Sequence, residues 1–589
     1  MASTFADHFF QTTLLSRRSL LTLAAGSALL AACGGDDDDD DDAPADGEGA
    51  DATATPTEAG GAMGSPEAEE TEEDVAETEP AMEAEETEPE EEEDEAGDEG
   101  EPRQGGVLRM GFEGDQVLSL DPPIVNFGTI AGELLPALFS SLVQFDETLA
   151  IQPDLAETFE VSDDGLSYTF HLREGLTFHN GDPLLAEDII YTYDRTLSPE
   201  LASPHANKLE VISSIEAVDD LTVEITLSQP FAPFLAVACS RGPGRALTPV
   251  SRRAVEEMGD DQYGLTPVGC GPFMIVPESV DVGEGFEMVA FEDWYGGRPH
   301  LDRIVVSLIP EPSSRVAALE AGDIDFMSDL PTTHYDQIAG NNDFTVVGAP
   351  GTNWVSLVIN HARPPWDNVD ARMAVAKAID KDAFNETAFL GLAVPSTSAI
   401  APAFGWVYLP PEQVETPQAY NLDEAKQLVE QTGIAGTTIK LMVAADNTRP
   451  GEVIRNMLAD IDLNVELEPL QDAAWSERWL AGDYDMMFNG SNTDADPDDG
   501  HWNFFHSTGP WNTHGLNNLE IDRLREETRA TVDQDARREQ FLEIARISQE
   551  EVSFAFLYHA PDYLAYRNNV KGYVAIPEQR YFEHVWLEG

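Results

Sequence analysis

Cysteine, lysine and long apolar segments are scarce in this chain. Only three cysteines occur among 589 residues, so the protein is not a small disulfide-dense scaffold. Lysine is rare, and 32 Lys and Arg residues face 111 Asp and Glu residues, for a formal net charge of −79. Phosphate binding needs clustered basic residues, so this balance argues against nucleic acid as a partner. No apolar run of about twenty residues follows Cys33, and no later membrane-spanning helix is predicted.

Familiar catalytic signatures are also missing. The sequence contains no G-x-S-x-G nucleophile elbow, no H-E-x-x-H helix and no P-loop. We therefore expect a protein that is not an enzyme and that needs no cofactor and no metal. A surface hydrolase remains an alternative, because an acid pair could hide among so many carboxylates.

The N-terminus has the pattern of an export signal over residues 1–32. Paired arginines, Arg17 and Arg18, precede the apolar run Leu20–Ala32, which resembles a twin-arginine signal. Leu30-Ala31-Ala32-Cys33 resembles the lipobox of prokaryotic lipoproteins, which implies lipidation of Cys33 and stable anchoring by two acyl chains. The alternative is an ordinary secretory signal that happens to end in a cysteine.

Residues 33–103 are predicted to be a disordered acidic tether. Asp36–Glu101 holds 32 acidic residues and no Lys, Arg or aromatic residue, so it cannot bury enough apolar surface to offset the entropy of ordering. Repulsion between like charges extends such a segment, which suits a spacer between the membrane and a folded body. Specific cation binding is the alternative.

The remaining chain is itself acidic, since a net charge of about −47 lies outside the tether. A carboxylate-rich surface of this kind resembles proteins adapted to high salt, where it keeps the fold solvated; ordinary acidity is the alternative. The length is enough for two or three domains.

Strand-like and helix-like segments alternate through the body, which is typical of an α/β fold. Residues 168–172 and 223–227 alternate apolar and polar side chains as half-buried strands do. Asn421 and Gly433 have the positions of an N-cap and a C-cap around one helix. A helical pair is predicted over residues 521–530 and 535–551, followed by a strand over 554–558.

An ordered series of short motifs across 104–589 resembles the extracellular solute-binding proteins of ABC transporters, family 5, the dipeptide/oligopeptide and nickel type. The densest stretch is Phe178-His179-Asn180-Gly181-Asp182-Pro183-Leu184, followed by Ala186-Glu187-Asp188. Pro267-Val268-Gly269-Cys270-Gly271-Pro272-Phe273 matches except at Cys270, where threonine is usual. The other fragments are Gly105–Arg109, Ser119–Pro122, Leu142–Phe145, Pro153–Glu157, Val161–Leu166, Phe170–Gly175, Trp294–Gly297, Ala317–Asp325, Pro364–Asp367 and Ala378–Lys381.

This resemblance implies a type II periplasmic-binding-protein-like fold, with two main lobes joined by a hinge and one additional family-specific subdomain. The first lobe would comprise 104–145, 268–350 and 552–589, the second, family-specific lobe 146–267, and the third lobe 351–551. The chain would cross between the main lobes near Pro350 and near Val552. Such a protein acts by closing over a ligand, and a permease recognises the closed form.

The resemblance also implies a ligand contact in the run Asn489–Asp498. Asp494 aligns with an aspartate that pairs with the ligand's α-amino group in peptide-binding relatives, a strong charge-assisted interaction. Ser491 stands where those relatives have tryptophan. A solvated loop acid is the alternative for Asp494, and a calcium loop is disfavoured because Asp499 and Phe505 occupy the places of its glycine and glutamate.

Other candidates for ligand contact are aromatic or amide residues. They are Trp354 and Asn360 on the predicted strand Asn353–Asn360, Trp406 and Tyr408 after the loop Pro395–Pro402, and Trp502. His501, His506 and His514 fit no standard metal-ligand spacing, and an aromatic loop packed on the third lobe is the alternative to a metal or metal-chelate site.

Two further pairs of residues each allow two interpretations. Cys239 and Cys270 could form a disulfide, because the predicted compartment permits one, or could be two buried thiols. Arg241 and Arg245 could bind a ligand carboxylate or form surface ion pairs.

The function expected from this pattern is that of a lipid-anchored, extracytoplasmic binding component of an ABC importer. Short peptides are the expected ligand, and an oligosaccharide, a nickel chelate or an opine-like compound is the alternative. Expected partners are that ligand, the permease subunits and, through the anchor, the membrane, and the protein is expected to be a monomer. A receptor that signals rather than imports is a further alternative.

Overall fold

A computed structural model describes residues 101–114, 117, 119–125, 130–242, 246–349, 351–492, 495–560, 562–577 and 579–589. The predicted signal, Cys33, almost all of the tether, Asp494 and Arg245 lie outside the described residues. Within those residues, no helix combines the length and apolar character needed to cross a membrane.

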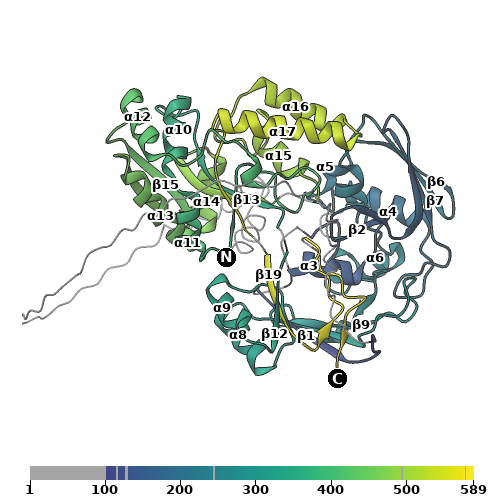
Figure 1. The fold of residues 1–589 in the computed structure, drawn as a ribbon. Coiled ribbons are helices and arrows are strands. Elements are labelled where there is room, and N and C mark those ends of the chain that lie inside the picture. Colours follow the sequence, from purple (N-terminus) through teal and green to yellow (C-terminus); the bar gives the residue numbers. More distant parts are fainter. Residues whose placement is uncertain are drawn as a thin grey trace, which may run out of the picture. The chain divides into compact units, whose positions relative to one another are not determined.

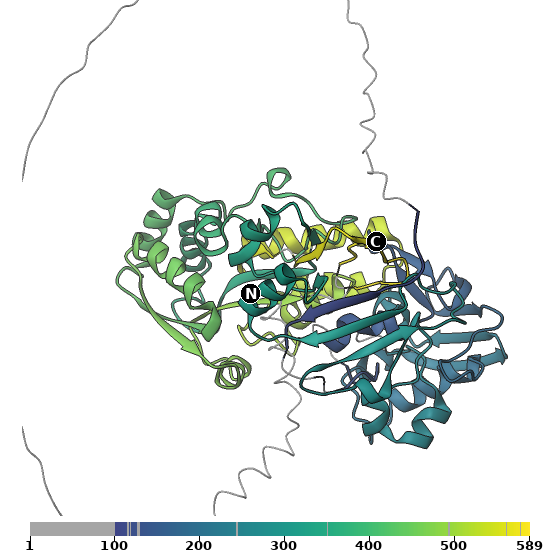
Figure 2. The ribbon, with the colours of Figure 1, turned by 90° about the horizontal axis from the view of Figure 1, so that it is seen from below.

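The first lobe is built on a seven-stranded mixed sheet with the order β12-β19-β11-β1-β10-β9-β8. β1 pairs in parallel with β10 and β11, and Figure 2 shows the purple β1 among the teal strands of this sheet. The strands are β1 (Val107–Phe112), β8 (Phe273–Ile275), β9 (Gly285–Ala290), β10 (Arg303–Leu308), β11 (Phe326–Met327), β12 (Phe344–Ala349) and β19 (Asp562–Arg567). The helices whose residues pack with it are α3 (Ile130–Leu138), α6 (Arg252–Met258), α7 (Asp260–Leu265), α8 (Pro312–Ala321) and α9 (Tyr335–Ala339).

The third lobe is built on a six-stranded sheet with the order β14-β18-β13-β17-β15-β16. Its strands are β13 (Asn353–Ile359), β14 (Val394–Pro395), β15 (Thr438–Ala444), β16 (Asn464–Leu470), β17 (Met486–Asn492) and β18 (Ala555–His559). Its helices are α10 (Val369–Ala378), α11 (Lys381–Phe389), α12 (Leu422–Thr432), α13 (Thr448–Ala459), α14 (Asp472–Leu480), α15 (Asp498–Phe505), α16 (Leu519–Ala530) and α17 (Gln534–Glu550). α16 and α17 lie side by side (Figure 1).

The second lobe carries a four-stranded antiparallel sheet with the order β4-β5-β7-β6. Its strands are β4 (Ala156–Val161), β5 (Ser167–Leu172), β6 (Ile212–Asp219) and β7 (Thr222–Leu227), and α4 (Ala186–Thr196) and α5 (Ala206–Leu209) accompany them. Two small pairs complete the described strands: β2 (Val143–Phe145) with β3 (Ile151–Pro153), and β20 (Val570–Lys571) with β21 (Trp586–Leu587).

Local sequence signals account for many of these elements. The alternating pattern of residues 168–172 and 223–227 forms β5 and β7, in which Tyr168, Phe170, Val223 and Ile225 are buried. The Asn421 side chain accepts a hydrogen bond from the backbone N–H of Glu424 at the start of α12. Gly433 ends that helix in the left-handed conformation, at φ 70°, where glycine carries no Cβ penalty.

The chain crosses twice between the two large sheets. β12 leads into β13 through residues 350–352, and β18 leads into β19 through residues 560–561. The second crossover therefore lies after His559 and not near Val552, because β18 pairs with β13 in the third lobe, with Tyr558 opposite Val355. α6 and α7 also depart from the expected bounds, since Ala254 and Tyr263 pack into the core of the first lobe.

The two crossovers run next to each other. On one side of them β12 pairs with β19, and on the other side β13 pairs with β18, in both cases antiparallel. The two main lobes are thus joined by two adjacent, paired strands, which is the arrangement expected of a hinge.

Candidate functional site

The loop after β17 is held in place by two buried carboxylates. Asp496 accepts two hydrogen bonds from the guanidinium of Arg537, at 2.6 and 2.7 Å. Asp498, at the start of α15, pairs with Arg525 at 2.7 Å and with Arg529 at 2.8 Å. Paired, hydrogen-bonded charges can be buried at this depth, so the α16–α17 pair fixes the segment that follows residues 493–494.

Burial and these ion pairs shift the pKa values of the arginines in opposite directions. Burial lowers the pKa of Arg525 to about 10, although the charge of Asp498 opposes that fall. Burial also lowers the pKa of Arg537, but attraction to Asp496 outweighs it, and the net shift is upward. Both arginines are therefore cations at neutral pH, and Asp496 and Asp498 serve as their counter-ions.

Two of the alternating acids are committed to arginine partners, Asp496 to Arg537 and Asp498 to Arg525. Their role is structural. Within the described part of the chain, no group of three or more His, Cys, Asp or Glu side chains is placed to hold a metal ion.

The same loop touches residues outside the third lobe. Ala495 packs against a cluster formed by Phe145, Ala236, Val237 and Ile576, which we call the bridging cluster. Phe145 belongs to β2, and Ala236 and Val237 belong to the π-helical turn Leu235–Cys239. The loop predicted to carry the ligand-binding aspartate therefore lies against the first and second lobes.

Trp502 lies on the same side of the third lobe. Its ring stacks on the His506 ring, with centroids 4.0 Å apart, and the Arg529 guanidinium lies 3.8 Å from its centroid. Arg529 also lies 5.7 Å from the centroid of the Phe231 ring, and its carbonyl oxygen accepts a hydrogen bond from the backbone N–H of Ala232 at 2.7 Å. Trp502 is thus part of a contact between the third lobe and the second.

Trp406 and Tyr408 are half-buried, and Trp406 lies next to an arginine that holds the loop after β17. The guanidinium of Arg537, which binds Asp496, lies 5.7 Å from the centroid of the Trp406 ring. The Tyr408 ring meets the His559 ring edge to face at 6.1 Å. These two aromatic candidates therefore remain compatible with a ligand site on this side of the third lobe.

Trp354 and Ser491 are paired across β13 and β17. The Trp354 side chain is fully buried and packs on the rings of Phe504, Phe505, Phe554 and Phe556. In this structure Trp354 packs beneath the sheet, and its side chain has no exposed surface that could contact a ligand. Ser491 is also buried.

Asn360 is not brought together with the other candidates. Its side-chain amide donates to the carbonyl oxygens of Gly482 and Tyr484 and accepts from the N–H of Ala362. It follows the far end of β13, six residues from Trp354, which corresponds to ~20 Å along a strand. Its polar atoms are used within the third lobe.

The histidines do not converge on a metal site. His501 is buried and shares a hydrogen bond with the carbonyl oxygen of Ala399 at 3.0 Å, and burial lowers its pKa to about 3. His506 stacks on Trp502, and His514 is buried against the Phe554 ring, where burial lowers its pKa. These placements agree with the aromatic-loop alternative.

Cys239 and Cys270 are free, buried thiols in the structure. The Cys270 Sγ lies 3.6 Å from the carbonyl oxygen of Ser140. Arg241 is likewise buried, where it forms an ion pair with Glu583 at 2.8 Å and donates to the carbonyl oxygen of Pro136. It is therefore neither a surface ion pair nor a free anion-binding group.

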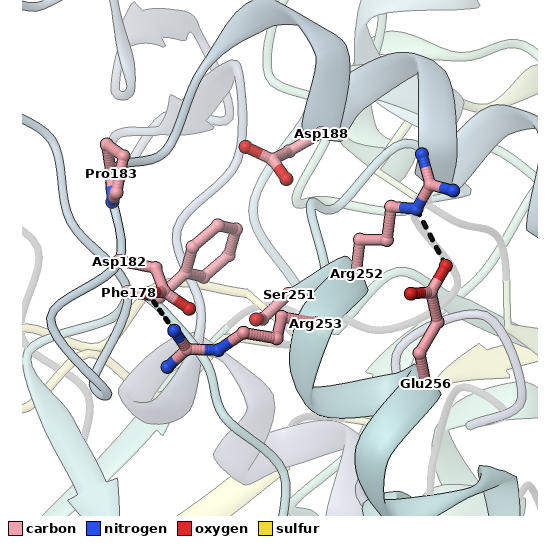
Figure 3. Close-up of a pocket in the computed structure, with 8 residues that line it drawn as sticks. All are labelled: Phe178, Asp182, Pro183, Asp188, Ser251, Arg252, Arg253 and Glu256. Carbon is pink, nitrogen blue, oxygen red and sulfur yellow. Dashed lines mark hydrogen bonds and ion pairs between the residues drawn. The ribbon is translucent and has the colours of Figure 1, made fainter.

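A separate cavity of about 280 Å³ lies in the region of densest motif resemblance (Figure 3). Arg253 pairs with Asp182, and Arg252 pairs with Glu256, both at 2.8 Å. Asp188 accepts from the backbone N–H of Leu185 at the start of α4. The charged groups of the cavity thus bind neighbouring residues, which gives the motif a structural role. The cavity is lined by Phe178, Asp182, Pro183, Asp188, Ser251, Arg252, Arg253 and Glu256.

Sequence reasoning missed the residues that organise the site, namely Asp496, Asp498, Arg525, Arg529 and Arg537. One signal was available: Arg525 and Arg529 are four residues apart on one helix, and so share a face. Nothing local indicated that this face would meet the acidic run.

Comparison with known proteins decides the family. The model of the bacterial extracellular solute-binding proteins, family 5, matches residues 150–512. The chain belongs to this family. Its expected fold is confirmed, because solved family members share the arrangement of lobes.

Individual family members match along most of their length. Heme-binding protein A of Haemophilus influenzae is 27% identical over 78% of this chain and 88% of its own length. Oligopeptide-binding protein AppA of Bacillus subtilis is 25% identical over 83% of this chain and 93% of its own length. The solved structure of the periplasmic binding protein DppA of Helicobacter pylori with the peptide STSA is 27% identical in sequence. The match covers 83% of this chain and 99% of that protein, with a TM-score of 0.69.

These findings establish the general role of this family 5 protein. It is an extracellular solute-binding protein of family 5. Its relatives are binding proteins of transporters and not enzymes, and family 5 proteins work outside the cytoplasm.

Proposed function

We propose that this protein is lipid-anchored at Cys33, captures short peptides between its first and third lobes, and delivers them to a membrane permease. The observation that carries the proposal is the anchored loop after β17. Two buried ion pairs hold Asp496 and Asp498, and Ala495 packs against the bridging cluster of the other lobes. Fixing these neighbours lowers the entropy cost of a ligand contact made beside them.

Asp494 is the proposed partner of the ligand's α-ammonium group. Its neighbours Asp496 and Asp498 are bound to arginines, so their charges are balanced and do not substitute for it. Asp494→Ala should weaken peptide binding by about 1.5–3 kcal/mol, the range for a hydrogen bond to a charged group.

Calorimetry with an unmodified and an N-acetylated peptide tests this role. Acetylation removes the ammonium charge, so it should weaken binding to the wild type and have little effect on Asp494→Ala. Equal affinity of the wild type and the variant for the unmodified peptide would remove Asp494 from the site.

A different solute is the second candidate, and Ser491 favours it. Peptide-binding relatives have tryptophan at the aligned position, whereas serine is small and polar and would change the shape of the site. Native mass spectrometry of the purified protein distinguishes the candidates, because a retained peptide and a retained sugar or metal chelate differ in mass. The same spectrum tests the proposed monomer.

The anchor and the closing motion have tests of their own. Intact-mass analysis of protein from the membrane should show a diacylated Cys33 at the N-terminus, and Cys33→Ser should release the protein from the membrane. Small-angle scattering should show a more compact body when ligand is added, and an unchanged profile would contradict closure.

A further inference from the structure

Leu149 lies in the turn between β2 and β3, and its half-buried side chain touches two separate apolar clusters. One of them is the bridging cluster. The other is an apolar cluster of the third lobe around Trp354, against which Trp406 and Tyr408 also pack. The turn stands at the start of the second lobe, so this leucine forms a direct apolar contact between the second lobe and the third.

The backbone at Leu149 is strained. Its φ is 61°, in the left-handed region that leucine rarely adopts because its Cβ crowds the backbone. The Asp146 carboxylate holds the turn in this shape, since its Oδ1 accepts from the backbone N–H groups of Thr148 at 2.9 Å and Ala150 at 3.0 Å. A non-glycine residue persists in such a conformation where the surrounding structure fixes it. Here the fixed turn presents the leucine side chain to the third lobe.

A second contact between the same two lobes lies at the turn between α16 and α17. The backbone N–H of Ala232 donates to the carbonyl oxygen of Arg529 at 2.7 Å. Val532 lies over Gly165, where an added Cβ would stand 2.6 Å from the Val532 Cγ2 atom. This turn of the third lobe therefore meets both the β4–β5 turn and the loop after β7.

These contacts join two lobes that no crossover connects directly. The paired crossovers link the first and third lobes, and the chain enters and leaves the second lobe from the first. A closing motion about the hinge would bring the second lobe onto the third, and an opening motion would break both contacts together. Apolar contacts made only on closing stabilise the closed form even without a ligand.

We propose that Leu149, Ala232, Arg529 and Val532 form a latch with which the second lobe holds the third lobe closed. The latch touches no ligand, and it sets the ratio of closed to open protein before a ligand enters the site. This inference rests on the proposed capture by closure and deepens it, because it assigns a task to the family-specific lobe.

Hydrogen exchange at the Ala232 amide tests the latch, because this N–H bonds across the two lobes. The measurement uses the full chain without ligand and resolves exchange by fragmentation mass spectrometry. Leu149→Gly removes the apolar contact, and glycine adopts the left-handed backbone without penalty, so the turn should keep its shape. Exchange at Ala232 should become about ten-fold faster in this variant, the scale of losing a partly buried leucine side chain.

The matched control is Leu390→Gly. Leu390 also has a φ of 60° and ends α11 in the third lobe, but its side chain is 47% exposed. The same substitution there should leave exchange at Ala232 unchanged. The amides of β7 should exchange at the wild-type rate in both variants, which shows that the second lobe stays folded.

The outcomes decide the proposal. Should Leu149→Gly leave exchange at Ala232 unchanged, or should Leu390→Gly accelerate it equally, the latch is wrong. Should Leu149→Gly also accelerate exchange in β7, Val532→Ser decides, because Val532 is 47% exposed and belongs to the third lobe. That variant should accelerate exchange at Ala232 alone, and an unchanged rate overturns the latch. Peptide binding is measured separately by calorimetry, so the latch can fail while the peptide function stands.

Discussion

The side chain of Asn353 forms hydrogen bonds with both backbone groups of Ala560. Its Nδ2 donates to the Ala560 carbonyl oxygen at 2.6 Å, and its Oδ1 accepts from the Ala560 N–H at 2.7 Å. The amide thereby joins the two chain crossovers at the point where they leave the third lobe. A Cβ at Gly351 would lie 2.4 Å from Asn353 Nδ2, so the close approach requires glycine there.

Asn353→Ala should destabilise the protein by about 2 kcal/mol, since each lost hydrogen bond contributes about 1 kcal/mol. The measurement is the free energy of unfolding from denaturant titration. Asn464→Ala is the control, because the Asn464 side chain makes one exposed bond, to the Gly436 carbonyl, and should cost under about 1 kcal/mol. Equal losses would contradict the role assigned to Asn353.

Arg529→Ala should cost about 1–3 kcal/mol of stability, because it removes one partner of the buried Asp498 and the cation over Trp502. The matched control is Arg523→Ala on the same helix, whose partners Glu520 and Glu527 are exposed and whose loss should cost under about 1 kcal/mol. Thermal unfolding of both variants measures the difference. A larger loss for Arg523→Ala would be inconsistent with the structure.

Cys239 and Cys270 should resist thiol reagents in the folded protein and react fully after unfolding without reductant. Burial raises the pKa of the Cys270 thiol to about 12 and also raises that of Cys239, so neither forms the reactive thiolate near neutral pH. Labelling followed by mass spectrometry counts the modified thiols. A requirement for reductant before labelling would show that the two are bonded.

Acid should destabilise the fold through buried histidines such as His501. Its pKa falls from an unfolded value near 6.5 to about 3, so the unfolded chain binds the proton first. The contribution to stability is complete above about pH 6.5 and is lost as the pH falls toward the folded value, by on the order of 3 kcal/mol at pH 4.

His501→Gln should make that pH dependence shallower, because glutamine does not titrate and its side-chain N–H₂ can still donate to the Ala399 carbonyl. Denaturant unfolding at pH 4, 5.5 and 7 provides the comparison. Identical slopes for the variant and the wild type would show that His501 does not contribute.

Added KCl or NaCl should raise the melting temperature of the full chain steeply. A net charge of −79 opposes compaction through self-repulsion, and salt screens that repulsion. Scanning calorimetry from 0.05 to 2 M salt measures the dependence. A melting temperature that does not change with salt concentration would contradict adaptation to high salt.

The sequence predicted elements whose signals are local. The Asn421 cap, the Gly433 end of α12 and the alternating strands β5 and β7 depend on residues a few positions apart, and all were confirmed. Local chemistry of this kind is readable without knowledge of tertiary contacts.

Features that depend on distant contacts could not be predicted. Asp496 meets Arg537 across 41 positions in the sequence, and no periodicity indicates such a pair. Trp354 lies on β13, a central strand buried on both faces, where the alternation that would tell inner from outer residues is absent. The second crossover was misplaced because β18 reads as a strand in either lobe, and only its pairing with β13 assigns it.

The paired crossovers have a mechanical consequence. A single covalent link would let the two main lobes twist independently, whereas two adjacent links between hydrogen-bonded strands resist torsion and bend most easily about one axis. A closing motion would then follow one arc, so the surfaces that meet around a ligand would be determined by the architecture and not by the ligand.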